Sequence, residues 1–101
     1  EIGKNFDDAG VMGVVTPRSD LLVMENAAIT LDVNHQPRQA GDINQMVYNT
    51  TELIAFPSTL QELKAGDLIF TGTPSGVGAV IRGDHLVGRI DGLEDLAIQL
   101  V

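Results

Sequence analysis

One stretch of the chain reads Thr71-Gly72-Thr73-Pro74-Ser75-Gly76-Val77-Gly78, and it directly follows the apolar run Leu68-Ile69-Phe70. A strand-like segment that runs into several glycines and a proline predicts a tight loop. Glycine lets the backbone approach a neighbouring group closely, and proline fixes the direction of the chain. The hydroxyls of Thr71, Thr73 and Ser75 can donate hydrogen bonds to an anionic or carbonyl oxygen. Taken alone, the stretch predicts either an ordinary strand connection or a loop that holds a ligand.

Two common phosphate-binding motifs do not fit this loop. The phosphate loop of nucleotide-hydrolysing proteins needs a lysine after its last glycine, and residues 71–78 contain none. The dinucleotide fingerprint needs a different glycine spacing and a following helix, and no helical pattern follows Gly78. A nucleotide phosphate is therefore not the ligand that the loop predicts.

The composition describes one small globular domain. The chain has 101 residues, of which 44% are hydrophobic and 20% charged, and its formal net charge is −8. Nucleic acid and anionic membranes need clustered Lys and Arg, but the six basic residues are scattered, so neither partner is expected. An anionic substrate would need positive charge from a lysine or a bound metal ion.

The absence of cysteine excludes thiolate catalysis, disulfides and zinc–thiolate sites. No apolar run approaches the roughly 20 residues that span a bilayer, and Glu1 opens nothing that resembles a signal sequence. We therefore expect a cytoplasmic protein. The start without methionine leads us to expect that the chain is part of a longer one.

The chain reads as a set of short strands joined by turns. Val11–Val15 is an apolar strand candidate, and Leu21–Val33 alternates in hydrophobicity, as a strand with one buried face does. Asn34-His35 has the character of a two-residue hairpin turn, with Gln36–Gln39 as the returning strand. His35 and His85 are predicted to be turn residues rather than catalytic ones. Further strands are expected at Leu68–Phe70, Val80–Ile81, Leu86–Ile90 and Leu96–Val101.

One helical region interrupts the strands. Asn49 and Glu52 have the spacing of a capping box, which predicts a helix start. Pro57 lacks an N–H and its ring clashes with the preceding turn, so we expect a kink or two short helical pieces. Residues 63–67 predict a turn. The fold class is therefore α+β and β-rich, a mixed β-roll or sandwich with one small helical region.

Three short sequence motifs occur in a fixed order along the chain. They are Gly3-Lys4-Asn5-Phe6-Asp7, then Val33-Asn34 with Arg38-Gln39-x-Gly41, and then Lys64-Ala65-Gly66-Asp67, which leads through the apolar run into Thr71–Gly78; we call them landmarks. Together they resemble the C-terminal part of the catalytic domain of the fumarylacetoacetate hydrolase family, closest to its acylpyruvate hydrolase members. The resemblance covers residues 1–101 as one incomplete domain. It implies a Mg²⁺ or Mn²⁺ ion that chelates a diketo acid, cleavage of a carbon–carbon bond by water, and a homodimer.

The resemblance also implies site residues. Lys4 matches a catalytic lysine beside the substrate oxygens, whereas spacing alone favours a solvated turn in which Lys4 pairs loosely with Asp7 and Asp8. Thr73 matches a threonine that holds a substrate oxygen, and Gly72 allows the backbone to come close. Asp8 stands where some relatives have a threonine near the metal. The family's metal ligands precede the lysine motif, so no metal ligand is expected in this chain.

Some positions depart from the family pattern, and alternatives stay open. Val11, Ile43 and Pro57 replace residues more usual in the family, and the glutamines and arginine around position 39 are interpreted as structural. The parent protein is expected to hydrolyse acylpyruvate- or fumarylpyruvate-like acids, whereas this chain alone is expected to be inactive. The alternatives are a decarboxylase or isomerase of related oxo acids, and a non-catalytic structural, dimerisation or binding module.

Overall fold

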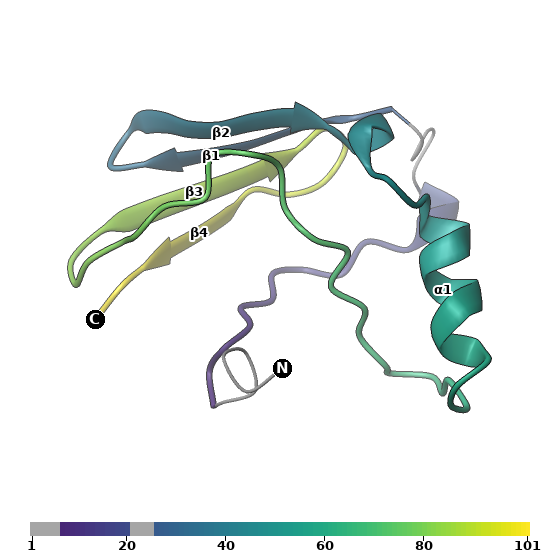
Figure 1. Ribbon diagram of the computed structural model, residues 1–101. Coiled ribbons are helices and arrows are strands. Elements are labelled where there is room, and N and C mark those ends of the chain that lie inside the picture. The colour runs from purple at the N-terminus through teal and green to yellow at the C-terminus, as the bar shows by residue number, and fades with distance from the viewer. Residues whose placement is uncertain (1–6, 21–25) are drawn as a thin grey trace.

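A computed structural model describes residues 7–20 and 26–101, in which one antiparallel sheet and one α-helix dominate (Figure 1). The strands are β1 (Ala28–Val33), β2 (Gln36–Asp42), β3 (His85–Ile90) and β4 (Leu96–Gln99), in the spatial order β2-β1-β3-β4. The helix α1 covers Thr50–Ser58, and two short 3₁₀ turns, η1 (Arg18–Asp20) and η2 (Ile43–Gln45), precede it. This arrangement confirms the predicted α+β, β-rich class.

The hairpin between β1 and β2 turns where the sequence predicts. Asn34 and His35 have φ angles of +51° and +64°, the positive values that a tight two-residue hairpin turn needs. The Asn34 N–H donates to the His85 carbonyl at 2.8 Å, and the Asn34 side chain accepts from the His85 N–H at 2.9 Å. His85 is thus the first residue of β3, and its prediction as a turn residue is wrong because Asn34 fixes it at the strand start.

An ion-pair cluster lies across the sheet. Arg89 in β3 donates to Asp32 in β1 at 2.6 Å and to Asp95, just before β4, at 3.0 Å. Both hydrogen bonds raise the pKa of the Arg89 guanidinium above its ordinary value, and the bond to Asp32 has the larger effect. The cluster joins three neighbouring segments of the sheet on one face.

The helix α1 begins with the predicted capping box. The Asn49 side chain accepts from the Glu52 N–H at 3.0 Å, and the Glu52 side chain accepts from the Asn49 N–H at 2.9 Å. The predicted kink at Pro57 is wrong, since α1 runs unbroken to Ser58. Pro57 lies in the last turn, where its missing N–H removes a single bond, to the Leu53 carbonyl, before the helix ends.

Three predicted strands are not formed among the described residues. Val11–Val15, Leu68–Phe70 and Val80–Ile81 carry no ladder of backbone hydrogen bonds to a neighbouring strand. These segments have apolar sequence but no strand beside them in the described chain, and hydrogen-bonded pairing is what defines a strand. β1 begins at Ala28, and the part of the predicted strand at residues 21–25 lies outside the described residues.

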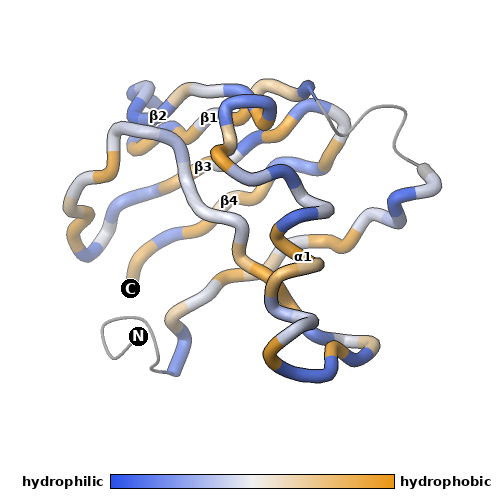
Figure 2. Tube along the Cα trace, turned by 45° about the vertical axis from the view of Figure 1, so that its right-hand side comes forward, coloured by the Kyte–Doolittle hydropathy of each residue, from blue (hydrophilic) through white to orange (hydrophobic). Residues whose placement is uncertain are grey.

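Few apolar side chains are enclosed. Among the described hydrophobic residues only Ala27 and Val33 are buried, whereas Val14, Phe70 and Val77 each expose more than 70% of their surface. Figure 2 shows hydrophobic stretches along α1 and the strands. None of the described helices has the length and apolar character to cross a membrane. Large apolar faces of this domain therefore remain uncovered by the described chain.

Candidate functional site

The glycine-rich loop lies against β2 and is held there by Gln39. The Gln39 amide nitrogen donates to the Pro74 carbonyl at 2.7 Å and lies 2.9 Å from the Thr73 hydroxyl, with a longer contact of 3.4 Å to the Ser75 carbonyl. Gln39 itself is half-buried in β2. One side chain of the sheet thus fixes three consecutive residues of the loop.

Glycine allows this close packing. Gly76 has φ +100°, and a Cβ built on it would lie 2.7 Å from the Arg38 carbonyl oxygen. Across the contact, a Cβ on Gly41 would lie 3.2 Å from the Pro74 Cβ. The predicted close backbone approach is therefore observed, but its partner is the β2 strand of this chain.

Gly72 differs from Gly76 in what surrounds it. Its φ is +105°, yet a Cβ built there would meet no heavy atom within 4 Å. The loop is therefore packed at one end and open at the other. The open end is where a ligand can approach the backbone, so the predicted role of Gly72 in binding substrate stays a prediction.

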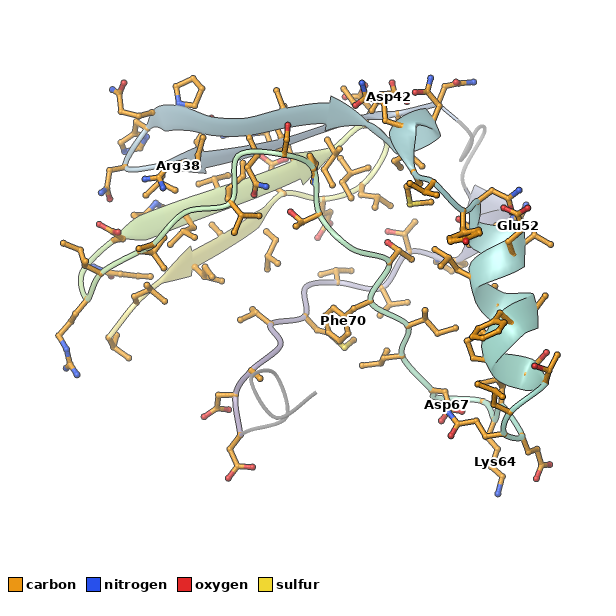
Figure 3. The ribbon with its side chains drawn as sticks, in the orientation of Figure 1. Arg38, Asp42, Glu52, Lys64, Asp67 and Phe70 are labelled. Carbon is orange, nitrogen blue, oxygen red and sulfur yellow. The ribbon has the colours of Figure 1, made fainter. Side chains whose placement is uncertain are left out.

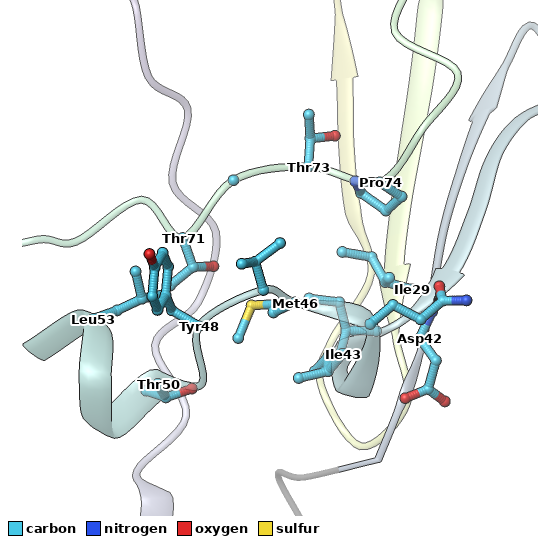
Figure 4. Close-up of a pocket in the computed structure, with 14 residues that line it drawn as sticks. Ile29, Asp42, Ile43, Met46, Tyr48, Thr50, Leu53, Thr71, Thr73 and Pro74 are labelled. Atoms are coloured by element: carbon cyan, nitrogen blue, oxygen red, sulfur yellow. Dashed lines mark hydrogen bonds between the residues drawn. The ribbon is translucent and has the colours of Figure 1, made fainter.

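A cavity of about 490 Å³ lies beside the loop (Figure 4). Thr71 to Pro74 form one wall, and residues between Asp42 and Leu53 form the opposite wall. Ile29 and Ile90, which pair across β1 and β3, complete the lining. In Figure 4 the side chain of Thr73 projects from the loop on the side away from Ile43 and Met46. Thr73 thus lies at the rim of the cavity with its hydroxyl on the exposed side.

Two polar side chains of the far wall, Asp42 and Gln45, form local hydrogen bonds. The Asp42 side chain accepts from the Asn44 N–H at 2.9 Å, and the Gln45 side chain accepts from the Asp42 N–H at the same distance. This reciprocal pair caps η2 and fixes the start of the wall that continues to Tyr48. Asp42 therefore has a structural role at the cavity edge.

The described residues do not supply a divalent-metal site. Within ranges 7–20 and 26–101, no three His, Asp or Glu side chains are grouped so that they could hold a metal ion. Asp42 is the one acidic residue among those that line the cavity in this part of the chain. A hard cation such as Mg²⁺ needs several converging oxygen ligands, so any such ion would have to be held by other residues.

The remaining predicted site residues are not brought together here. Lys4 lies outside the described residues, so its convergence with Thr73 stays a prediction. Asp8 lies in an exposed turn with φ +60° and is not among the residues that line the cavity. Lys64 and Asp67, which belong to the third landmark and were not predicted site residues, lie at the turn beyond α1, away from the sheet (Figure 3). Thr73 and Gly72 are the predicted residues that share the cavity rim.

Sequence reasoning missed the wall opposite the loop. The cavity is lined by Met46 and Tyr48, in the connection before α1, and by Leu53 in α1. Where these two segments lie relative to the loop depends on the tertiary fold, which the sequence pattern does not give. Gln39 was interpreted as structural, and its contacts confirm that it holds the loop. Its link to Thr73 had no signal in the sequence, because the two are 34 residues apart.

Comparison with known proteins decides the family. A sequence model of the family described as "Fumarylacetoacetate (FAA) hydrolase C-terminal" matches residues 1–101. The chain belongs to the fumarylacetoacetate hydrolase family. A fumarylpyruvate hydrolase from Ralstonia sp. is 39% identical over 98 residues, which cover 97% of this chain and 50% of that protein. An oxaloacetate tautomerase from Escherichia coli is 37% identical over 93 residues, covering 91% of this chain and 42% of that protein.

Solved structures of the fumarylacetoacetate hydrolase family agree. The crystal structure of fumarylpyruvate hydrolase from Pseudomonas aeruginosa in complex with Mn²⁺ and pyruvate is 45% identical, with a TM-score of 0.81 over 84% of this chain and 36% of that one. The chain thus spans half or less of the length of these relatives. The family model that it matches is described as C-terminal, and the relatives named above are enzymes of small oxo acids.

Proposed function

We propose that the protein carrying this chain hydrolyses a carbon–carbon bond in a fumarylpyruvate-like acylpyruvate. The observation that carries the proposal is the Thr71–Gly78 loop, held by β2 at a cavity rim, in a chain 39% and 45% identical to two fumarylpyruvate hydrolases. Hydrolysis of such a substrate adds water across the bond between the acyl carbonyl and the pyruvate methylene. The products are the free acid and pyruvate.

In this proposal the chain binds and orients the 2-oxo acid end of the substrate. The Thr73 hydroxyl, on the side of the loop away from Ile43 and Met46, donates to a carboxylate or keto oxygen, and Gly72 leaves room for that oxygen beside the backbone. Lys4 supplies a fixed positive charge that stabilises the enolate formed as the bond breaks. Since the chain carries a net charge of −8, attraction of a dianionic substrate depends on such local positive charge.

A divalent cation, Mn²⁺ or Mg²⁺, belongs to the proposal as the group that polarises the carbonyls, held by residues outside the described chain. The relative solved with Mn²⁺ and pyruvate supports this part. We also propose a homodimer, because the exposed apolar side chains of the described chain need cover. A cytoplasmic location is a further part of the proposal.

Relatives with another activity, an oxaloacetate decarboxylase and oxaloacetate tautomerases, favour a second function. The Escherichia coli protein, 37% identical, is an oxaloacetate tautomerase, and tautomerisation or decarboxylation of oxaloacetate also passes through an enolate. The same threonine and lysine would serve either reaction, so the residues of this chain do not separate the two. The choice rests on which substrate the upstream part of the protein accepts.

The test is turnover by the whole protein with fumarylpyruvate or oxaloacetate, each with Mn²⁺ and with Mg²⁺, and product identification by ¹H NMR. We expect fumarate and pyruvate from fumarylpyruvate, at a rate well above that of the 101-residue chain alone. Faster conversion of oxaloacetate would assign the second function. No turnover of either acid, with intact protein and both metals, would favour a binding or structural role.

A further inference from the structure

We propose that Gln39 is a positioning residue that sets the direction in which the Thr73 hydroxyl donates its hydrogen bond. For the identity of the ligand the inference rests on the proposed function, whereas the hydrogen-bond polarity stands on the geometry alone. The starting observation is that one side-chain amide in β2 contacts Thr73 Oγ1, the Pro74 carbonyl and the Ser75 carbonyl.

The partners determine which end of the amide faces the loop. The Pro74 and Ser75 carbonyl oxygens only accept hydrogen bonds, so the group turned toward them must be the NH₂ of Gln39. That NH₂ has two hydrogens. The short contacts to the Pro74 carbonyl at 2.7 Å and to Thr73 Oγ1 at 2.9 Å use both.

The polarity at Thr73 follows from this count. If the Gln39 NH₂ donates to Thr73 Oγ1, the hydroxyl oxygen is the acceptor in that bond. Its own proton cannot also point to Gln39 and must be donated elsewhere. Thr73 is exposed and projects on the side of the loop away from Ile43 and Met46, so the free proton is available to a ligand oxygen on the open side.

The packing around Gln39 keeps this arrangement in place. Gln39 pairs with Leu31 in the β1–β2 ladder, which fixes its backbone. On the loop side, a Cβ at Gly76 would lie 3.3 Å from the Gln39 Cγ and 2.7 Å from the Arg38 carbonyl, so the loop backbone lies directly on this part of β2. Donors fixed before the ligand arrives need no reorganisation during the reaction, which is the condition for effective charge stabilisation.

The kind of ligand atom that fits is therefore an acceptor oxygen. A carboxylate or keto oxygen of a 2-oxo acid accepts the Thr73 proton without any change in the Gln39 bond. Reversing the polarity at Gln39 should turn the Thr73 proton inward and leave only a lone pair for the ligand. The substitution that does so with almost no change of shape is Gln39→Glu, because a carboxylate only accepts.

The experiment measures pyruvate binding to the whole protein, with Mn²⁺ present, by isothermal titration calorimetry. We expect Gln39→Glu to weaken pyruvate binding about tenfold, roughly 1.4 kcal/mol. Gln61→Glu is the matched control, since it adds the same charge at an exposed glutamine beyond the end of α1 and outside the cavity lining; it should change affinity less than twofold.

A double-mutant cycle separates positioning from general damage to the site. In the Thr73→Val background the hydroxyl is gone, so Gln39→Glu should weaken pyruvate binding by less than twofold more. A loss that is equally large with and without the Thr73 hydroxyl would overturn the proposal. If Gln39→Glu lowers the melting temperature so far that the protein is unfolded, Gln39→Met replaces it, with the same expected non-additivity.

An NMR measurement tests the polarity if the wild-type protein binds no pyruvate, an outcome that would count against the proposed function alone. The Gln39 side-chain NH₂ protons should exchange with water more slowly than those of Gln61, and Thr73→Val should shift one of the two resonances. Equal exchange for both glutamines, or no shift on Thr73→Val, would overturn the role of Gln39.

Discussion

Replacing Gly76 by alanine should release the glycine-rich loop from β2. The substitution has two costs that the structure separates. The first is backbone strain, since φ +100° is a conformation that an L-residue rarely adopts, and it costs about 1–3 kcal/mol. The second is steric, because the new Cβ would lie 2.7 Å from the Arg38 carbonyl oxygen, and such overpacking costs about 1–3 kcal/mol more.

Gly66→Ala is the matched control for this prediction. Gly66 has φ +97°, and a Cβ built there would meet nothing within 4 Å, so the control has the strain without the clash. Urea unfolding of the whole protein should show a loss of stability for Gly76→Ala that exceeds the loss for Gly66→Ala by about 1–3 kcal/mol. Pyruvate binding should weaken only in Gly76→Ala, since its loop carries Thr73.

Equal losses of stability for the two alanine variants would refute the reasoning. They would mean that the loop shifts away from β2 without cost, so that the contacts of Gln39 with the loop carry little energy. If Gly76→Ala is folded and binds pyruvate as tightly as the wild type, the claim that contact with β2 positions Thr73 for binding is contradicted.

Three further predictions concern single side chains. Asn49→Ala should lower the free energy of unfolding by about 1 kcal/mol, the usual loss for an N-cap, measured by urea denaturation. The Ile81 N–H and the Asn34 side chain lower the pKa of the Asp84 carboxyl below its ordinary value of 3.8. The stabilisation by Asp84 is therefore present above about pH 4 and lost as pH falls through the lower folded-state pKa, so Asp84→Asn should flatten the pH dependence of stability in that acid range, and an unchanged slope would contradict this. Lys4→Ala should raise the activation free energy of turnover by the whole protein by about 2–4 kcal/mol, and an unchanged kcat would show that Lys4 is not in the site.

The local signals of the sequence predicted local structure well. The Asn34-His35 turn, the capping box at Asn49 and the turn before Asp67 each depend on residues within five positions of one another, and all three are present. Their physical causes, positive φ and side-chain capping, act within the segment itself. Hydrophobic alternation likewise predicted the strand that ends at Val33.

The failures share a cause that lies outside the segment. Leu68–Phe70 has the apolar sequence of a strand, but strand pairing requires a neighbour, and none lies beside it in the described chain. Figure 3 shows Phe70 on an extended segment between the sheet and α1, where a Cβ at Gly10 would lie 2.8 Å from its ring. Pro57 was expected to disrupt the helix, because the sequence does not show that the helix ends at Ser58 and that Pro57 therefore lies in its last turn.

Part of the candidate site was predicted from the sequence, and part of it was not. Thr73 and Gly72 came from the resemblance, and the structure places both at the rim of a cavity. The link from Gln39 to Thr73 could not be predicted, because it depends on how a loop and a strand 34 residues apart pack together. The cavity wall from Asp42 to Leu53 was missed for the same reason.

The most direct test of the account is a crystal structure of the whole protein with Mn²⁺ and pyruvate. We predict that Thr73 Oγ1 lies about 2.6–3.0 Å from a pyruvate oxygen while it keeps its contact with the Gln39 amide, and that Lys4 faces the same ligand. Pyruvate bound elsewhere, with Thr73 turned to solvent and Lys4 on another surface, would contradict it.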